Sequence, residues 1–212
     1  MSVDLSKTYY SGFFGLNNGI IRNLIVDGNI SITCPVDNGS FNNFGGFCGY
    51  NHGTVLNCIF KGQIVSTAVE NLACYIAGVV GFNDDGSIEL CDNYGNISSD
   101  FNVSGICGYN SDGIIDECDN YGTITGKRDA TGITEMNNRS KIINCINYGE
   151  IIADMVSGEY YPSASGIVGN NYQSVIENCI NEGEIVGPFG ETGGIIGILD
   201  GDASEMTGCT YG

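Results

Sequence analysis

Seven acidic side chains lie close together in two consecutive copies of a repeated pattern, and four of them occupy matching places. Glu89 and Asp116 share one place in the pattern, and Asp92 and Asp119 share another. The other three lie in the turns nearby: Asp84, Asp85 and Asp112. Like charges in neighbouring copies repel each other, so we interpret the cluster as a solvated acidic face or as a docking face for a basic protein. Calcium coordination is a third interpretation, although neither the nonapeptide of calcium-binding rolls nor an EF-hand loop is present.

Aromatic side chains provide a second set of candidate binding residues. Tyr94, Tyr121 and Tyr148 occupy one place in three consecutive copies. Such a row is typical of ladder packing inside a repeat protein, and if it is partly exposed it would receive a sugar ring or the aliphatic face of a partner. Variable connections between repeats are where binding usually lies, and the aromatic residues there are Phe41, Phe44, Tyr160 and Tyr161.

Catalytic chemistry has weaker support in the sequence. A carboxylate pair could serve as acid and base in a polysaccharide-acting β-helix enzyme, but the few lysines and arginines do not gather at one place in the pattern. A nucleophile elbow and a Gly-rich phosphate loop are both missing. A CxxC pair is missing too, and His52 is the only histidine. We therefore expect no enzyme, no cofactor and no metal site.

The elements that must position these residues are the copies of the repeat. The first glycines of seven copies are Gly12, Gly46, Gly78, Gly105, Gly132, Gly166 and Gly194, 27 to 34 residues apart. Short β-branched runs separated by Gly, Asn and Asp indicate strands, three in each copy. The sequence therefore predicts an all-β, single-domain, right-handed parallel β-helix, or β-solenoid, of seven coils spanning 10–212, with 1–9 as an N-terminal cap. Seven coils at strand spacing give a rod of about 34 Å.

Two kinds of residue recur so regularly that they predict internal ladders. The pattern asparagines are Asn17, Asn51, Asn83, Asn110, Asn137 and Asn171, and we expect each amide to donate to the next. Six cysteines share another place: Cys58, Cys91, Cys118, Cys145, Cys179 and Cys209. Apolar residues replace cysteine at equivalent places, which predicts free thiols pointing inward. Disulfides, if any, are expected only at Cys34 and Cys74, which the pattern places in loops.

The copies resemble the GLUG-type repeats of bacterial surface proteins. The motif appears here as GFCGYNHGTVLNCIFKGQI, GICGYNSDGIIDECDNYGTI and GIVGNNYQSVIENCINEGEI, and the similarity covers 12–212. Such repeats occur in secreted adhesin-like proteins. The resemblance therefore implies a non-catalytic binding module that engages a protein or a glycan at the cell surface or outside the cell.

Net charge favours a different alternative. Seven Lys and Arg against 25 Asp and Glu give a net charge of −18, which disfavours direct binding to nucleic acid or to an anionic membrane. Because no signal peptide is visible, a cytoplasmic location is the close alternative. There the chain would be an acidic decoy that mimics nucleic acid and blocks a basic protein. The strand edge expected in the last coil also predicts an end-to-end homodimer.

Overall fold

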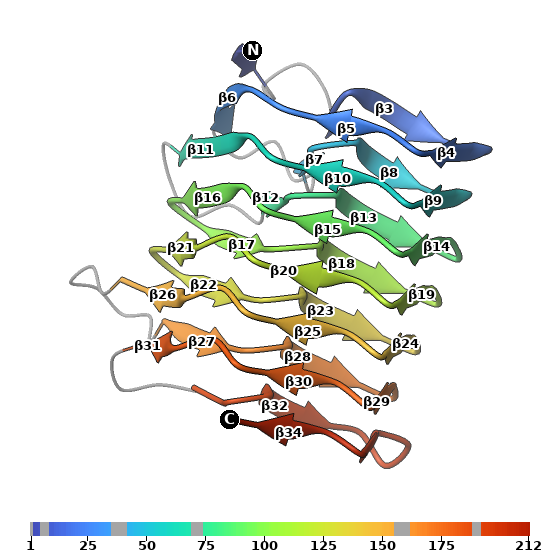
Figure 1. The fold of residues 1–212 in the computed structure, drawn as a ribbon, viewed down its shortest axis with the longest axis vertical. Coiled ribbons are helices and arrows are strands. Elements are labelled where there is room, and N and C mark those ends of the chain that lie inside the picture. The colour runs from blue at the N-terminus through green and yellow to red at the C-terminus, as the bar shows by residue number, and fades with distance from the viewer. Residues whose placement is uncertain (1, 5–8, 35–41, 69–73, 155–161, 188–191) are drawn as a thin grey trace.

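The computed structural model describes residues 2–4, 9–34, 42–68, 74–154, 162–187 and 192–212. These residues form five parallel sheets, A to E; successive coils contribute one strand to each sheet in turn, and the last coil contributes strands to sheets C, D and E. In Figure 1 the descending chain passes from sheet C at the back, through sheet D on the right and sheet E at the front, to sheet A on the left. This path is a right-handed coil. The prediction of a parallel β-solenoid of about seven coils is confirmed.

Sheets A and B form one side of the coil. Sheet A contains β1 (Ser2–Asp4), β6 (Asn29–Cys34), β11 (Gln63–Ala68), β16 (Asn96–Ser99), β21 (Ile124–Gly126), β26 (Ile151–Ala153) and β31 (Ile185–Val186). Sheet B contains β2 (Tyr10–Ser11), β7 (Asn42–Gly45), β12 (Cys74–Ala77), β17 (Asn102–Ser104), β22 (Asp129–Thr131) and β27 (Ser163–Ser165). β1 pairs in parallel with β6. Sheet A therefore begins before the first repeat.

Sheets C, D and E complete the coil. Sheet C contains β3 (Phe14–Asn17), β8 (Cys48–Asn51), β13 (Val80–Asp84), β18 (Cys107–Ser111), β23 (Thr134–Asn138), β28 (Val168–Tyr172) and β32 (Ile196–Asp200). Sheet D contains β4 (Ile20–Arg22), β9 (Thr54–Leu56), β14 (Ser87–Glu89), β19 (Ile114–Asp116), β24 (Lys141–Ile143), β29 (Val175–Glu177) and β33 (Glu205–Thr207). Sheet E contains β5 (Ile25–Val26), β10 (Ile59–Phe60), β15 (Asp92–Asn93), β20 (Asp119–Asn120), β25 (Ile146–Asn147), β30 (Ile180–Asn181) and β34 (Thr210–Tyr211).

The expectation of three strands in each copy is wrong, because each full coil contains five short strands, and single residues in left-handed conformation form two of the corners between them. At the corner between sheets D and E these residues are Asn23, Asn57, Leu90, Glu117, Asn144 and Asn178, with φ near 50°. At the corner between sheets C and D they are Asp85, Asp112, Arg139 and Gln173. Asn and Asp tolerate this conformation better than most residues. Leu90 and Arg139 give no such local signal, so the corners are hard to recognise from residue types alone.

The predicted asparagine ladder is present inside the corner between sheets C and D. Each side-chain Nδ2 donates to Oδ1 of the next asparagine over 2.7–2.9 Å, from Asn17 through to Asn171. Several of the amides also donate to a carbonyl of the turn, as Asn51 does to the Gly53 oxygen at 3.1 Å. The ladder therefore satisfies buried turn groups that would otherwise lack partners.

A second amide ladder, which the sequence did not reveal, lies behind sheet E. Asn93, Asn120, Asn147 and Asn181 are buried and are joined by hydrogen bonds of 2.7 Å. Each amide also donates to the carbonyl of the glycine two residues later, such as Gly122. A Cβ on Gly122 would overlap the backbone oxygen of Gly95, so close coil stacking requires glycine here.

All ten cysteines are free, and all except Cys209 are buried. In the shared cysteine column each thiol donates to the carbonyl two residues earlier and to one in the preceding coil; Cys91, for example, reaches the oxygens of Glu89 at 3.1 Å and Val55 at 3.5 Å. The expectation that Cys34 and Cys74 lie in loops is wrong, because both are buried in strands, β6 and β12. These strands continue into segments that looked like variable connections.

Candidate binding surfaces

The three predicted tyrosines form a stack on the outer side of sheet E. The rings of Tyr94 and Tyr121 lie 4.4 Å apart and 3° from parallel, and those of Tyr121 and Tyr148 lie 4.8 Å apart and 8° from parallel. Their residues remain 47%, 39% and 39% exposed. In-register stacking of the coils imposes this spacing, since each tyrosine follows the second residue of its sheet E strand.

Face-to-face packing decides what the stack can bind. The faces of Tyr121 are both covered by its neighbours, so a sugar ring cannot lie flat on it. The Lys61 ammonium lies 6.0 Å from the centre of the Tyr94 ring, a cation–π contact at one end of the stack. The stack therefore presents ring edges and hydroxyl groups to solvent.

Two of the predicted carboxylates flank this stack. Asp92 and Asp119 are direct partners across β15 and β20. Asp119 accepts hydrogen bonds from the Tyr121 hydroxyl at 3.2 Å and the Ile146 backbone N–H at 3.1 Å. Partial burial, together with the charge of Asp119, raises the pKa of Asp92 to about 6. Burial also raises the pKa of Asp119. A cationic side chain of a partner would therefore stabilise the charged forms of both carboxylates.

Aliphatic residues continue the same outer column above and below the carboxylates. Ile59 precedes Asp92 in register, and Ile146 and Ile180 follow Asp119. We call the surface made by these residues with Asp92, Asp119 and the three tyrosines the tyrosine face. It has aromatic and charged residues at its centre and apolar residues on either side, on a single parallel sheet (Figure 1).

The remaining predicted carboxylates do not join this face. Glu89 and Asp116 are register partners on sheet D, where Asp116 accepts a hydrogen bond from Asn144 at 3.0 Å. Asp112 forms a two-pronged ion pair with Arg139, with N–O distances of 2.9 and 2.5 Å. This contact holds the pKa of Asp112 below its usual range.

Asp84 and Asp85 lie at the end of β13. Asp84 accepts a hydrogen bond from the Tyr50 hydroxyl at 2.6 Å, and His52 Nε2 lies 3.7 Å from its carboxylate. Asp85 is an exposed corner residue with φ of 55°. The seven carboxylates are therefore divided among sheets C, D and E and the corners between them. Within the described ranges, no three His, Cys, Asp or Glu side chains are grouped so as to hold a metal ion.

The aromatic residues predicted from the connections give no additional surface. Tyr160, Tyr161 and Phe41 lie outside the described residues. The expectation that Phe44 lies on a recognition surface is wrong, because Phe44 is fully buried in β7, where it is the register partner of Ile76. In the described part of the chain, no helix is long and apolar enough to cross a membrane.

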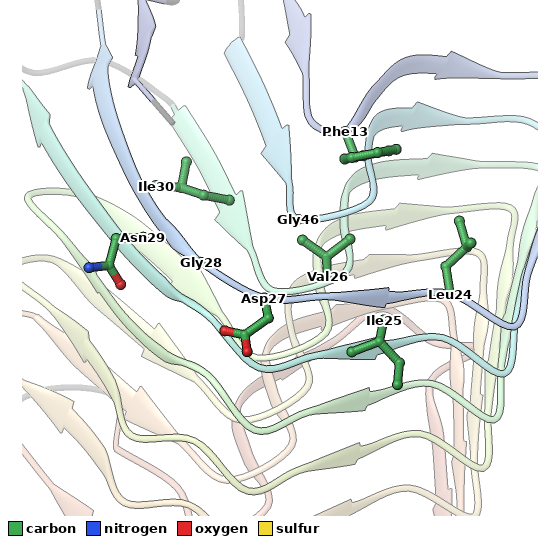
Figure 2. A pocket seen from close by; sticks show the side chains of 9 residues that line it. All are labelled: Phe13, Leu24, Ile25, Val26, Asp27, Gly28, Asn29, Ile30 and Gly46. Atoms are coloured by element: carbon green, nitrogen blue, oxygen red, sulfur yellow. The ribbon is translucent and has the colours of Figure 1, made fainter.

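A pocket of about 330 Å³ lies at the first coil (Figure 2). Leu24, Val26 and Ile30 point to one side of the ribbon, and Asp27 and Asn29 point to the other. Val26 and Ile30 are the register equivalents of buried Phe60 and Ile64. The pocket is therefore the place where the columns of the apolar core reach the first coil.

A second aromatic row, missed from the sequence, lies on the outer side of sheet C. Tyr50, Phe82 and Tyr109 are register partners, and Met136 follows them. Phe82, Tyr109 and Met136 of this row line a groove together with Asn43 and Tyr75 of sheet B. The sequence could have indicated this row, because its three aromatic residues share one place in the repeat. It gave no indication that residues of sheet B lie beside them.

No protein-family model, curated protein or solved structure matches this chain in the comparisons made. The similarity to GLUG-type repeats therefore rests on the motif alone.

Proposed function

We propose that the chain is a non-catalytic, adhesin-type binding module whose tyrosine face docks a protein partner. The observation behind this proposal is the exposed stack of Tyr94, Tyr121 and Tyr148 beside the Asp92–Asp119 pair. Small-molecule sites are usually concave, whereas this surface is the outer face of one sheet. Tyrosine is enriched at the centres of protein interfaces, because its ring buries apolar area while its hydroxyl keeps a polar contact.

The partner surface is expected to carry a Lys or Arg side chain opposite Asp92 and Asp119. A cation there would relieve the repulsion between the two carboxylates and would stabilise their charged forms. Lys61 over Tyr94 is an example within the chain of a cation on this face. Because the pKa of Asp92 is about 6, affinity for such a partner should fall as the pH drops below 6.

The division of acidic residues among several sheets gives the decoy alternative less support. A rod of about 34 Å that replaced duplex DNA would need about 20 charges on one side. The seven candidate carboxylates instead lie on sheets C, D and E and at the corners between them, and Asp112 is already paired with Arg139.

Capture of partners by immobilised protein tests the proposal. Wild-type chain, Tyr121→Ser and Asp92→Asn are compared on extracts of cells that produce the protein, and captured proteins are identified by mass spectrometry. We expect at least one protein to bind the wild type and to be lost with both variants. That protein is then purified and titrated against each form, and an affinity loss of about tenfold is expected.

Tyr172→Ser is the matched control, because Tyr172 is an equally exposed tyrosine on sheet C, 42% accessible. It should leave capture unchanged. A partner that binds Tyr121→Ser as well as wild type, or that is lost with Tyr172→Ser, would place recognition elsewhere and contradict the proposal.

A further inference from the structure

The corner between sheets D and E has the same left-handed backbone in all seven coils. Four of the seven corner residues are asparagines, and the last is Gly208, with φ of 65°. Asparagine and glycine adopt this conformation at the lowest cost. The two exceptions are Leu90, with φ of 53°, and Glu117, with φ of 50°. They occupy consecutive coils, because Leu90 donates its N–H to the backbone oxygen of Asp116, the residue before Glu117.

Asparagines at this corner also form hydrogen bonds between coils. Asn57 Nδ2 donates to Asn23 Oδ1 at 2.7 Å, and Asn144 Nδ2 donates to the Asp116 carboxylate at 3.0 Å. A leucine side chain has no group that can form such a bond. Leu90 therefore lacks both the backbone preference and the contact between coils that asparagine has at this place.

Packing inside the coil does not compensate for this loss. Leu90 is 49% exposed, so its side chain gains only part of the free energy of full burial. A single exposed leucine in a relaxed strand would need no explanation. Leu90 is different, because its backbone is strained, and strain of this kind is retained where function requires a particular side chain.

Both exceptions lie in the two coils that carry the centre of the tyrosine face. Leu90 is two residues before Asp92, and Glu117 is two residues before Asp119. The two aspartates are direct register partners, and in each coil a stacked tyrosine follows two residues later. These corners lie between β14 and β15 and between β19 and β20, where the chain passes from sheet D to sheet E (Figure 1). They therefore adjoin the proposed docking face.

The charges around Leu90 indicate which side chains would cover it. Glu89 precedes it on the outer side of sheet D, and Asp92 follows it on the outer side of sheet E. Glu117 is exposed at the same corner in the next coil. An aliphatic residue flanked by Lys or Arg is complementary to this surface, because it can pack on Leu90 while the cations face the carboxylates.

We propose that Leu90 is the apolar anchor of the partner-binding surface, and that this surface continues from the tyrosine face around the corner to Glu117. The inference rests on the proposed function, since it assigns a contact residue and a partner chemistry to the same face. The partner segment carries an aliphatic residue between basic residues. It lies across the corner, with its aliphatic side chain on Leu90 and its cations beside Asp92 and Glu117.

Urea unfolding of Leu90→Asn tests the first step of the inference. Asparagine relieves the backbone strain, so the unfolding equilibrium constant should fall about fivefold. Leu16→Asn is the matched control, because Leu16 is a similarly exposed leucine, at 53%, in strand β3 of sheet C. It should gain no stability. If Leu90→Asn is no more stable than wild type, leucine costs nothing at the corner and the inference is overturned.

NMR titration with two capped peptides, KRLRK and KRSRK, tests the contact itself. Wild type should bind the leucine peptide about fivefold more tightly than the serine peptide, because only the first can pack on Leu90. Leu90→Asn should bind both peptides alike, whereas Leu90→Met and Leu16→Asn should keep the preference. Equal affinity of the two peptides for wild type, or a preference that persists in Leu90→Asn, overturns the inference.

The purified protein from the Tyr121-dependent capture separates this inference from the proposed function. Leu90→Asn should weaken its affinity about tenfold, and a variant that is more stable than wild type cannot owe this loss to a damaged fold. A partner that is lost with Tyr121→Ser yet binds Leu90→Asn as it binds wild type overturns the anchor role alone. A partner that binds Tyr121→Ser as well as wild type contradicts the proposed function, and the anchor role of Leu90 is overturned with it.

Discussion

Asn171 is the last member of the asparagine ladder, because its register partner in the next coil is Leu199. Asn110, in contrast, lies in the middle of the ladder. It accepts from Asn83 at 2.8 Å and donates to Asn137 at 2.9 Å. The same residue type therefore has a different number of amide partners at the two levels.

This difference predicts unequal costs for one substitution. Asn110→Leu leaves the Asn83 donor and the Asn137 acceptor without their partners in a buried site, and we expect a loss of about 2–4 kcal/mol of unfolding free energy. Asn171→Leu leaves only the Asn137 donor unpaired, because the Ser174 carbonyl, which loses its bond from Asn171 Nδ2, still accepts from the Glu205 N–H at 3.0 Å. The new leucine also extends the column begun by Leu199, so the substitution should cost about half as much. Urea unfolding measures both. Equal costs would show that the amide ladder does not set the difference.

The Asp92–Asp119 pair predicts a stabilising substitution on the tyrosine face. The pKa of Asp92 is about 6 in the folded chain, above the usual 3.8, so ionisation opposes folding at neutral pH. This penalty is present above pH 6 and is lost as the pH falls from 6 toward 4. Asp92→Asn should therefore raise the unfolding free energy by about 1–2 kcal/mol at pH 7 and by little at pH 4.

Denaturant unfolding at pH 7, 5 and 4 checks this prediction. Asp202→Asn, at an exposed residue of the last coil, is the control for a general effect of net charge. If Asp92→Asn is destabilising at pH 7, or if the control gains as much stability, repulsion in the pair is not the cause.

The sequence predicted the parallel stacking of the coils. Gly, Asn, Cys and Ile recur in a fixed order, and an in-register parallel stack is the arrangement that aligns them. It did not reveal the second amide ladder, since Phe60 and Val26 replace asparagine in the first two coils. The tyrosine stack was predictable from one repeat place. The groove was not, because its walls come from two sheets and Tyr75 lies in a strand that looked like part of a variable connection.

Thiol burial predicts strongly selective alkylation. Nine of the ten thiols are buried inside the coil, where the reagent cannot reach them. Under native conditions iodoacetamide should modify only Cys209, the one cysteine that is not buried. Mass spectrometry should find one adduct on the native chain and ten in denaturant. The Cys209→Ser variant should show none when native, and rapid labelling of most thiols would contradict the buried ladder.

Ionisation of Glu135 predicts that the fold loses stability between pH 4.5 and 8. Burial raises its pKa to about 8 in the folded chain, and the pKa is near the usual 4.5 in the unfolded chain, so the folded state holds a proton that the unfolded state releases between these values. Stability should therefore fall as the pH rises from 4.5 to 8 and then level off. Glu135→Gln cannot ionise, yet its side-chain oxygen can still accept from Asn170. The variant should match wild type near pH 4.5 and exceed it on the order of 3 kcal/mol at pH 7.

Unfolding free energies measured from pH 4.5 to 9 for both proteins test this difference. Glu205→Gln serves as the control, because Glu205 is exposed on β33 and its charge is already solvated. Its pH profile should run parallel to that of wild type, since removing a solvated charge changes folded and unfolded chains alike. A Glu135→Gln profile that is also parallel would mean that the carboxyl group ionises freely in the folded chain.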